Sequence, residues 1–288
     1  MTDRRETLRK GFVRWTTCER LFMQLGKPPI IEVSIDFSFE SSSGEPEWDY
    51  TRAAEFVDRF QAEYPETEIA AQQLLVEVQK VARGTKPTFE SRVVPVAVRA
   101  FPANRSRYLL SAKDKLQCFF VRTGENDYRG FSALKAEAMD KLAAYVEYFR
   151  PAKLIRFTVQ YVDFFRIPLV KGRADLRDYF TICGEPDESI FGMTINFRKS
   201  FTTKPPDSED LLTCELYNVP KGKEQKAPSI PFRMEWGLHA FENLSWDAES
   251  LSQRLQKAHD GLLHYFANSF TKTGWALFDP TEPHEGRA

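Results

Sequence analysis

Histidine and cysteine are the residue types best suited to metal binding and nucleophilic catalysis, and their spacing in this chain supports neither. His259 and His264 lie five residues apart in a segment of helical periodicity, so they do not share the helix face that ligands four residues apart would occupy. The four cysteines are widely separated and form no CxxC pair. The chain also lacks a GxSxG elbow and the glycine-rich loops that bind nucleotide phosphates. The sequence therefore predicts no metal ion and no cofactor, and it identifies no catalytic residue.

Carboxylates on a predicted strand offer a second kind of chemistry. Glu32, Asp36 and Glu40 lie on one face of a strand at 31–40, where they alternate with apolar residues. Together with Glu235 of a later strand, they could form a carboxylate pair for acid–base catalysis. We favour cross-strand ion pairs on the open face of the sheet instead. The candidate arginine partners are Arg156, Arg166, Arg198 and Arg233.

Asp163 differs from these carboxylates because it follows Tyr161 on the apolar face of a strand predicted at 154–167. A buried carboxylate needs a polar partner, and we expect an arginine or a tyrosine hydroxyl in that role. Structural pairing is favoured over catalysis. The candidate ligand-binding residues of the chain are Glu32, Arg107, Arg156, Tyr161 and Asp163.

Two aromatic residues break the pattern of their strands. Alternation places Phe119 and Phe164 on the face opposite their apolar neighbours, where exposure would indicate a surface for a partner. Exposed rings beside arginines can also bind single-stranded nucleic acid. The arginines available for this are Arg105, Arg107, Arg122 and Arg156. However, the chain has 40 Lys and Arg against 41 Asp and Glu, and a net charge of -1 disfavours a nucleic-acid binder.

Residues 1–26 are predicted to form a basic, amphipathic helical extension. Phe12, Trp15 and Phe22 recur near helical spacing, and the prolines that follow end the segment. An amphipathic segment outside the folded domain indicates an element that binds a protein partner. These three aromatic residues therefore join Phe119 and Phe164 as candidate partner-binding residues.

Hydrophobic periodicity predicts an α+β fold with an antiparallel sheet flanked by helices. In the first half of the chain the expected elements are a strand at 31–40, a helix ending at Pro65, a mixed segment at 68–84, strands near 94–98, 105–111 and 115–122, and a helix at 131–149. In the second half they are a strand at 154–167, a short helix at 175–180, strands near 190–201, 211–218 and 231–241, and a helix at 247–272.

The two halves share an order of elements, namely strand, helix, three strands and helix. We therefore predict one α+β domain over residues 27–278, with pseudo-repeats at about 27–150 and 151–278. A disordered tail is expected at 279–288. Pro95 indicates an edge position for its strand, because proline cannot donate to a ladder of hydrogen bonds.

Several short motifs resemble, in order and spacing, those of a sporadically distributed family of uncharacterised bacterial proteins. The matching positions are Pro28, Pro29, Glu32, Arg107, Tyr128, Gly130, Phe131, Arg156, Tyr161, Asp163, Ile167 and Pro168. The family more often has asparagine at the position of Asp163. The resemblance covers residues 27–278 and implies the architecture and a bacterial setting, but no activity.

We expect a non-catalytic, cytoplasmic binding or adaptor protein that engages another protein. No apolar run reaches the length of a signal peptide or of a membrane span. The sporadic distribution of the family suggests a phage-defence or mobile-element setting. One alternative is a binder of single-stranded nucleic acid or nucleotides. Another is an enzyme with a dispersed site that gathers Glu32, Asp163, Tyr161 and an arginine.

Overall fold

The computed structural model describes residues 28–40, 50–78, 88–123, 130–183, 189–191, 197–205, 208–219, 229–241, 244 and 247–279. The predicted helical extension, with Phe12, Trp15 and Phe22, and nearly all of the predicted tail lie outside these ranges. Among the described helices, none is long and apolar enough to cross a membrane.

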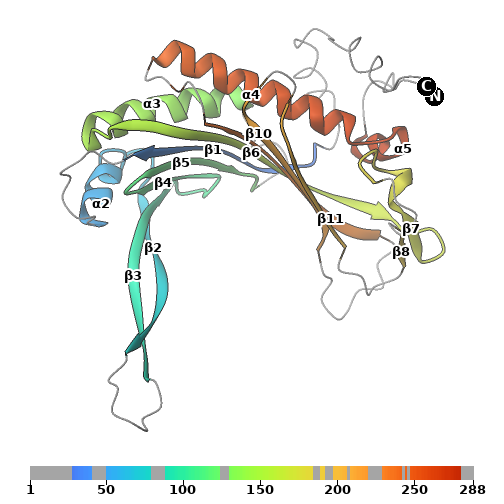
Figure 1. Cartoon of the computed structure of the whole chain (residues 1–288), viewed down its shortest axis with the longest axis horizontal. Helices are drawn as coiled ribbons and strands as arrows, with labels where there is room; N and C mark the ends of the chain where they lie inside the picture. The colour runs from blue at the N-terminus through green and yellow to red at the C-terminus, as the bar shows by residue number, and fades with distance from the viewer. Residues whose placement is uncertain are drawn as a thin grey trace. The chain divides into compact units, whose positions relative to one another are not determined.

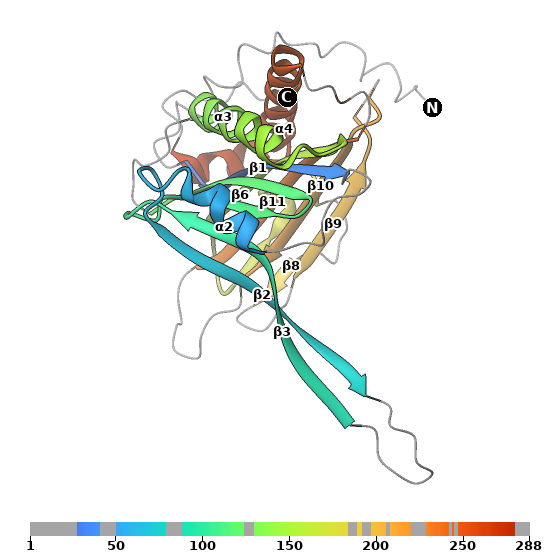
Figure 2. The ribbon, with the colours of Figure 1, turned by 90° about the vertical axis from the view of Figure 1, so that its left-hand side faces the viewer.

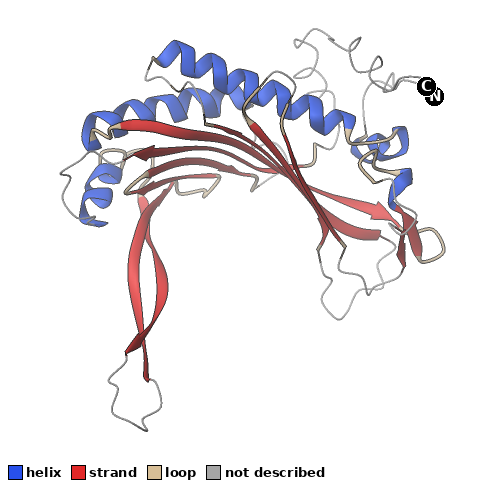
Figure 3. Ribbon diagram, viewed as in Figure 1, coloured by secondary structure: helices blue, strands red, loops and turns tan. Residues whose placement is uncertain are grey.

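The structure confirms the predicted α+β class, because an antiparallel sheet of nine strands is flanked by helices (Figures 1 and 3). The strand order is β2-β3-β4-β5-β1-β6-β11-β10-β9. The strands are β1 (Ile30–Glu40), β2 (Glu66–Val78), β3 (Thr88–Phe101), β4 (Arg107–Ala112), β5 (Lys115–Val121), β6 (Lys153–Pro168), β9 (Arg198–Thr203), β10 (Leu211–Asn218) and β11 (Ser229–Ala240). The helices are α2 (Tyr50–Asp58), α3 (Phe131–Phe149), α4 (Ala248–Asn268) and α5 (Lys272–Trp275).

The chain divides into two compact units. The N-terminal unit comprises Val33–Thr158 and Ala240–Ala248. The C-terminal unit comprises Val159–His239, the segment from Glu249 onward, and the start of β1 up to Glu32. The predicted boundary between pseudo-repeats, at 150/151, lies close to the change of unit within β6.

The order of elements differs from the expected one in each half. The predicted mixed segment at 68–84 is strand β2 as far as Val78, so the first half has four strands between its helices. In the second half, the expected short helix is a single 3-10 turn, η2 (Leu176–Asp178), between β7 (Arg173–Asp175) and β8 (Ser189–Phe191). The Asp175 side chain caps this turn by accepting a hydrogen bond from the backbone of Arg177.

The core of the N-terminal unit lies between its part of the sheet and helices α2 and α3. The predicted inward face of β1 is confirmed from Val33 to Phe39, because alternate side chains there are fully or almost fully buried. Phe39 stacks on Tyr145 of α3 with ring centroids 4.6 Å apart. Phe56 of α2 contacts the same tyrosine and Phe149, at 5.5 and 5.6 Å. Aromatic packing of this kind stabilises the two helices against the strand beneath them.

The core of the C-terminal unit is an aromatic cluster beside α4. Its closest contacts join Phe270 to Phe266 at 4.9 Å and to Phe278 at 5.0 Å. The predicted helix at 247–272 is too long, because α4 ends at Asn268. Thr271 then caps the separate helix α5 by accepting a hydrogen bond from the backbone of Gly274. Gly274 permits this turn, since a Cβ there would lie 2.0 Å from the carbonyl oxygen of Tyr179.

Candidate functional site

The most prominent exposed element of the N-terminal unit is a long hairpin formed by β2 and β3. The two strands pair continuously from Glu66↔Phe101 to Val78↔Thr88. In contrast, β3 pairs with β4 only between Ala97 and Ala100. The eight outer pairs, from Ala71↔Pro95 to Val78↔Thr88, therefore have no third strand among the residues that the structure describes. We call these residues, Ala71–Val78 and Thr88–Pro95, the arm.

The arm leaves the sheet of the N-terminal unit at an irregularity in the register. Ala70 pairs with Ala97 and Ala71 pairs with Pro95, so Val96 has no residue opposite it. An extra residue of this kind bends a strand and increases its twist. Figure 2 shows the two strands continuing past this point away from the rest of the unit. Eight pairs at about 3.4 Å per residue give an arm about 27 Å long.

Pro95 occupies the first pair of the arm. The sequence predicts an edge position for this proline, and β3 as a whole is an internal strand of the sheet. The prediction is therefore wrong for β3 as a whole. At Pro95 itself, the described part of the chain places β2 on one side of β3 and no strand on the other.

Within the described ranges, no further strand pairs with either edge of the arm's backbone. In an antiparallel ribbon about half of the N–H and C=O groups point away from the partner strand. The arm's sequence contains three charged residues in sixteen, whereas eight are Ala, Val, Leu or Phe. At its base, the side chains of Ile69 and Val96 are 58% and 38% exposed. An isolated two-stranded ribbon is only marginally stable in water, and such edges readily pair with another strand.

The candidate residue Glu32 lies in an ion-pair network on the open face of the C-terminal unit. Its Oε2 is 3.2 Å from the guanidinium of Arg233, which also lies 3.0 Å from Glu235. Glu235 accepts hydrogen bonds from Tyr217 at 2.7 Å and from Gln160 at 3.3 Å. The predicted cross-strand pairing is confirmed for Glu32 and Arg233.

The same face of the N-terminal unit carries Asp36 and Arg156, which do not pair with each other as expected. Asp36 accepts a hydrogen bond from Gln117 at 2.5 Å and forms an ion pair with Lys115 at 3.3 Å. Burial raises the pKa of Asp36, and Lys115 opposes this shift. Arg156 donates to the hydroxyl of Ser38 at 3.1 Å.

Arg107, another of the candidate ligand-binding residues, faces helix α3 in the N-terminal unit. Its guanidinium lies 3.2 Å from Glu137 and 5.4 Å from the ring centre of Tyr64. The Tyr64 hydroxyl donates to Glu137. Burial, and then the charge of Glu137, raise the pKa of this tyrosine. Arg105, named for nucleic-acid binding, pairs with Glu66 at 2.9 Å and Glu68 at 2.8 Å.

Tyr161 and Asp163 lie on the buried side of β6, close to α4. The Tyr161 hydroxyl is 2.6 Å from Nδ1 of His259, which is buried. The expected partner of Asp163 is not found, because its Oδ1 accepts no hydrogen bond within the described part of the chain. The hydroxyl of Tyr161, two residues earlier on β6, contacts His259 of α4 instead of Asp163. Burial alone raises the pKa of Asp163 well above its usual range.

The surroundings of Asp163 form a small, mostly apolar cavity of about 10 Å³, lined also by Tyr161, Trp236, Leu262, Leu263 and Phe266. The Trp236 indole N–H has no hydrogen-bond partner within the described residues. A cavity of this size holds about one water molecule and has no room for a substrate. Burial also raises the pKa of the Cys214 thiol, and the charge of Asp163 adds to this shift. A buried neutral thiol is a poor nucleophile.

The dispersed enzyme site is not assembled among these residues. Glu32 meets Arg233 on one face of the sheet, whereas Asp163 lies with Trp236 on the other. The alternating burial of β11 separates the two faces, since Arg233 is partly exposed and Trp236 is buried. Within the described ranges, no group of three or more His, Cys, Asp or Glu side chains could hold a metal ion.

The two aromatic candidates differ in exposure. Phe164 is 36% exposed on β6. Phe119 is only partly exposed, because it stacks on Tyr108 of the neighbouring strand with ring centroids 4.3 Å apart. Their role in binding a partner stays a prediction.

Sequence reasoning missed the arm because it treated 68–84 as a mixed segment and the strand near Pro95 as short. The signal that could have found it is the pair of apolar runs at 74–78 and 93–98, which flank a turn-forming stretch containing Gly84 and Pro87. No known family model matches this chain, and comparison with curated proteins finds no related sequence.

Proposed function

We propose that this protein is a non-catalytic binding or adaptor protein, and that its arm pairs with an extended segment of a protein partner. The observation that carries the proposal is the set of eight backbone pairs to which no other described segment adds a third strand. Addition of a strand to an open edge is a common mode of protein recognition, in which main-chain hydrogen bonds supply affinity. The low charge of the arm and the exposed Ile69 and Val96 at its base support a protein surface as the partner.

The proposal includes a bacterial, cytoplasmic setting. Reduced thiols are typical of the cytoplasm, and the cysteines in the described ranges, Cys118, Cys183 and Cys214, are buried and form no disulfide. The connection to phage defence or mobile elements stays a prediction from the family resemblance. Binding of nucleic acid is the less favoured function, because Arg105, Arg107 and Arg156 are engaged by neighbouring side chains.

A shortened arm tests the proposal. Gln73 and Val93 face each other in the register, so residues 74–92 can be replaced by an Asn-Gly turn that closes a two-residue hairpin. This change removes five of the eight arm pairs and leaves the rest of β2 and β3 intact. A second variant lacking residues 1–26 tests the predicted helical extension as the binding element.

The partner is first identified by affinity purification of the full chain from its native host with mass spectrometry, and nucleic acid is analysed in the same eluate. The shortened-arm variant should then lose the purified partner, whereas the full chain retains it. Hydrogen exchange of the arm's backbone amides should slow when the partner is added. Unchanged affinity of the shortened-arm variant, with unchanged circular dichroism, would refute the role of the arm.

A further inference from the structure

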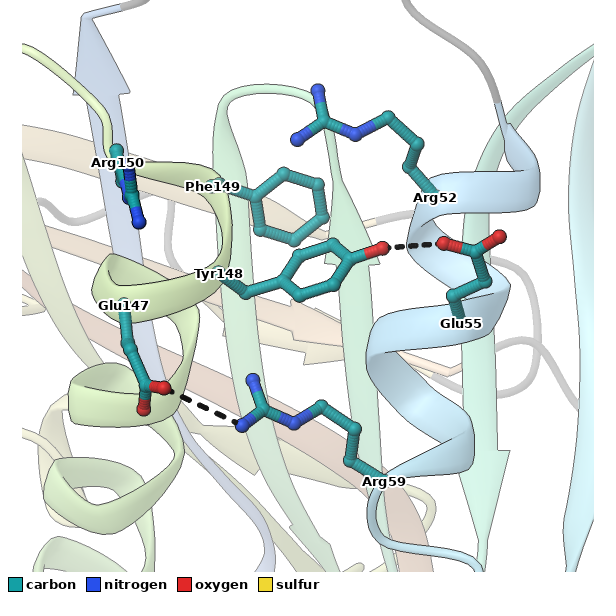
Figure 4. A pocket seen from close by; sticks show the side chains of 7 residues that line it. All are labelled: Arg52, Glu55, Arg59, Glu147, Tyr148, Phe149 and Arg150. Atoms are coloured by element: carbon teal, nitrogen blue, oxygen red, sulfur yellow. Dashed lines mark hydrogen bonds and ion pairs between the residues drawn. The ribbon is translucent and has the colours of Figure 1, made fainter.

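A depression of about 550 Å³ between helices α2 and α3 collects charged side chains on the surface of the N-terminal unit (Figure 4). Its lining residues are Arg52, Glu55, Arg59, Glu147, Tyr148, Phe149 and Arg150. Arg59 lies 3.8 Å from Glu147, and Glu55 accepts a hydrogen bond from the Tyr148 hydroxyl at 2.6 Å. The charges of these three residues are therefore matched by neighbours within the chain.

The part of β3 that belongs to the arm carries one residue of each charge, Glu90 and Arg92. In the register of the arm, Val76 lies opposite Glu90 and Leu74 lies opposite Arg92. Opposite charges that face each other across a ladder stabilise a pair of strands, and β2 supplies an apolar residue at both positions. Within the described part of the chain, no strand lies along the other edge of β3 here. A strand added at this edge can bring the complementary charges.

The hydrogen-bonding pattern of an antiparallel ladder limits how this edge can pair with a second copy of itself. Along an edge strand, every second residue directs its N–H and C=O groups outward. Two copies related by a two-fold axis therefore pair odd-numbered residues with odd-numbered ones and even with even. The three central registers of the strand each place one residue at the axis, opposite the same residue of the second copy. These axial residues are Glu90, Ser91 and Arg92.

Charge distinguishes these three registers. With Glu90 or Arg92 at the axis, two residues of like charge lie opposite each other, which destabilises the pair of strands. With Ser91 at the axis, Glu90 of each copy lies opposite Arg92 of the other. The remaining pairs join Phe89 to Val93 and Thr88 to Val94. The register with Ser91 at the axis has seven pairs over about 24 Å, and it ends just before Pro95.

We propose that the outer edge of β3 pairs with a second copy of this chain, in an antiparallel, two-fold symmetric sheet with Ser91 at the axis. This inference rests on the proposed function, because it names the strand that one edge of the arm binds. The two arms together form a four-stranded sheet, which is more stable in water than separate two-stranded ribbons. A two-fold interface is closed, so the product is a dimer. The β2 edge, whose one charged residue is Glu77, stays open to a different protein.

Charge reversal tests this register in the full chain by sedimentation equilibrium. The wild type should form a dimer whose fraction rises with concentration. E90R and R92E should each weaken dimerisation about tenfold, because each places two like-charged pairs beside the axis. The double variant E90R/R92E should dimerise as the wild type does, since both opposite-charge pairs are restored. An equimolar mixture of E90R and R92E should form a mixed dimer for the same reason.

E77R is the matched control for these variants. It makes the same charge reversal within the arm, but on β2, which lies on the far side of β3 from the proposed axis. It should dimerise as the wild type does.

A cysteine substitution tests the position of the axis independently of charge. S91C places two cysteines directly opposite each other, at a spacing that a disulfide can bridge. Oxidised glutathione accepts the two electrons of the two thiols and leaves as two molecules of glutathione. S91C should then form a covalent dimer on a non-reducing gel. V93C should not, because its cysteines would lie about 14 Å apart along the strands, and the wild type reports any cross-link through its own cysteines.

Three results would overturn the proposal. The first is a wild-type chain that stays monomeric, and the second is a dimer that E90R and R92E leave unchanged. The third is a loss of dimer in E77R equal to that in E90R. If a charge-reversed variant fails to fold, the comparison of S91C with V93C decides, since equal cross-linking of both contradicts the axis at Ser91.

These outcomes are distinguishable from a failure of the proposed function. A monomeric chain whose shortened-arm variant loses the purified partner refutes the self-pairing and retains the role of the arm. A dimer that follows the charge-reversal pattern, combined with full affinity of the shortened-arm variant for the purified partner, refutes the proposed function and retains the self-pairing.

Discussion

Asp163 gives the sharpest quantitative prediction of this structure. Its side chain is 1% exposed, and its Oδ1 accepts no hydrogen bond from any described residue. Burial raises the pKa of this carboxyl well above its usual range, because the ionised form loses hydration and gains no cation. The folded protein should therefore keep the proton of Asp163 at pH values where the unfolded chain has lost it.

The direction of the pH dependence follows from proton linkage. An aspartate in the unfolded chain has a pKa of about 3.9. Between that pH and the raised pKa of the folded state, folding must restore a proton to Asp163. As the pH rises through this window, the free energy of unfolding falls by about 1.4 kcal/mol for each pH unit. Below about pH 4 both states hold the proton, and this contribution to the pH dependence disappears.

Asp163→Asn removes the titration and keeps the shape of the side chain. The difference in unfolding free energy, variant minus wild type, should rise by about 1.4 kcal/mol per pH unit within this window. Urea unfolding, followed by circular dichroism in steps from pH 4 to about pH 8, measures this difference directly.

Asp178→Asn is the matched control, because it makes the same chemical change at an exposed position of the same unit. A free-energy difference for Asp163→Asn that does not change with pH would refute the reasoning. It would mean that Asp163 is ionised in the folded protein and has found a cation. If the unfolding free-energy difference of Asp178→Asn rose with pH as steeply as that of Asp163→Asn, the effect could not be assigned to the burial of Asp163.

Three further substitutions test local features of the C-terminal unit. The hydrogen bonds from Arg177 lower the pKa of Asp175 to about 2. Because the Asp175–Arg177 ion pair is exposed, Asp175→Asn should lower the free energy of unfolding at neutral pH by less than about 1 kcal/mol. The loss should shrink as pH falls from about 4 towards 2, as pH-dependent urea unfolding would show. Gly274→Ala should destabilise the protein by more than about 3 kcal/mol in thermal unfolding, since its Cβ would lie 2.0 Å from the Tyr179 carbonyl oxygen. Gly261→Ala should raise stability by about 0.5–1 kcal/mol in the same assay, because this helical position has 3.8 Å of room to Leu238.

Elements that bury one continuous face were predictable from the sequence. The helix at 131–149 is α3 with the same bounds, and the residues expected on its inner face, from Phe131 to Phe149, are buried. The predicted inward residues of β1 are likewise buried. In both cases a single face packs on the core, so the spacing of the apolar residues predicts whether the segment is a helix or a strand.

Features that depend on contacts between distant residues were not predictable in the same way. The end of α4 is one example, since Phe270 pairs with Phe180 in an isolated bridge, and Thr271 caps a new helix. The apolar period continues through this point, so the sequence pattern predicts one long helix. Lys141 is another example, because its burial depends on Glu63, 78 residues earlier, at 2.9 Å. Local periodicity contains no information about such partners.

The open faces of the sheet explain why sequence reasoning found one set of arginines and missed another. Arginines on strands stand out because they alternate with apolar residues. Their neighbours across the sheet are also polar, however, and Arg233 and Arg156 are engaged there by Glu32 and Ser38. Arg52 lies on the short helix α2 and Arg59 directly after its end, among other charged residues, where no pattern distinguishes them. Only the approach of α3 brings a third arginine and two rings to the same place.

The arm was hard to predict for the same physical reason that supports its proposed role. A strand that packs on a core on one side has an alternating sequence, because one face is dry and the other is wet. The segment from Leu74 to Val78 does not alternate, and among the described residues the strand from Thr88 to Pro95 pairs with β2 alone. The sequence of this ribbon therefore lacks the pattern by which a strand with one buried face is recognised. A sequence that is apolar without alternation and a backbone with open edges are both expected of a ribbon that becomes an inner part of a sheet only when a partner adds its own strand.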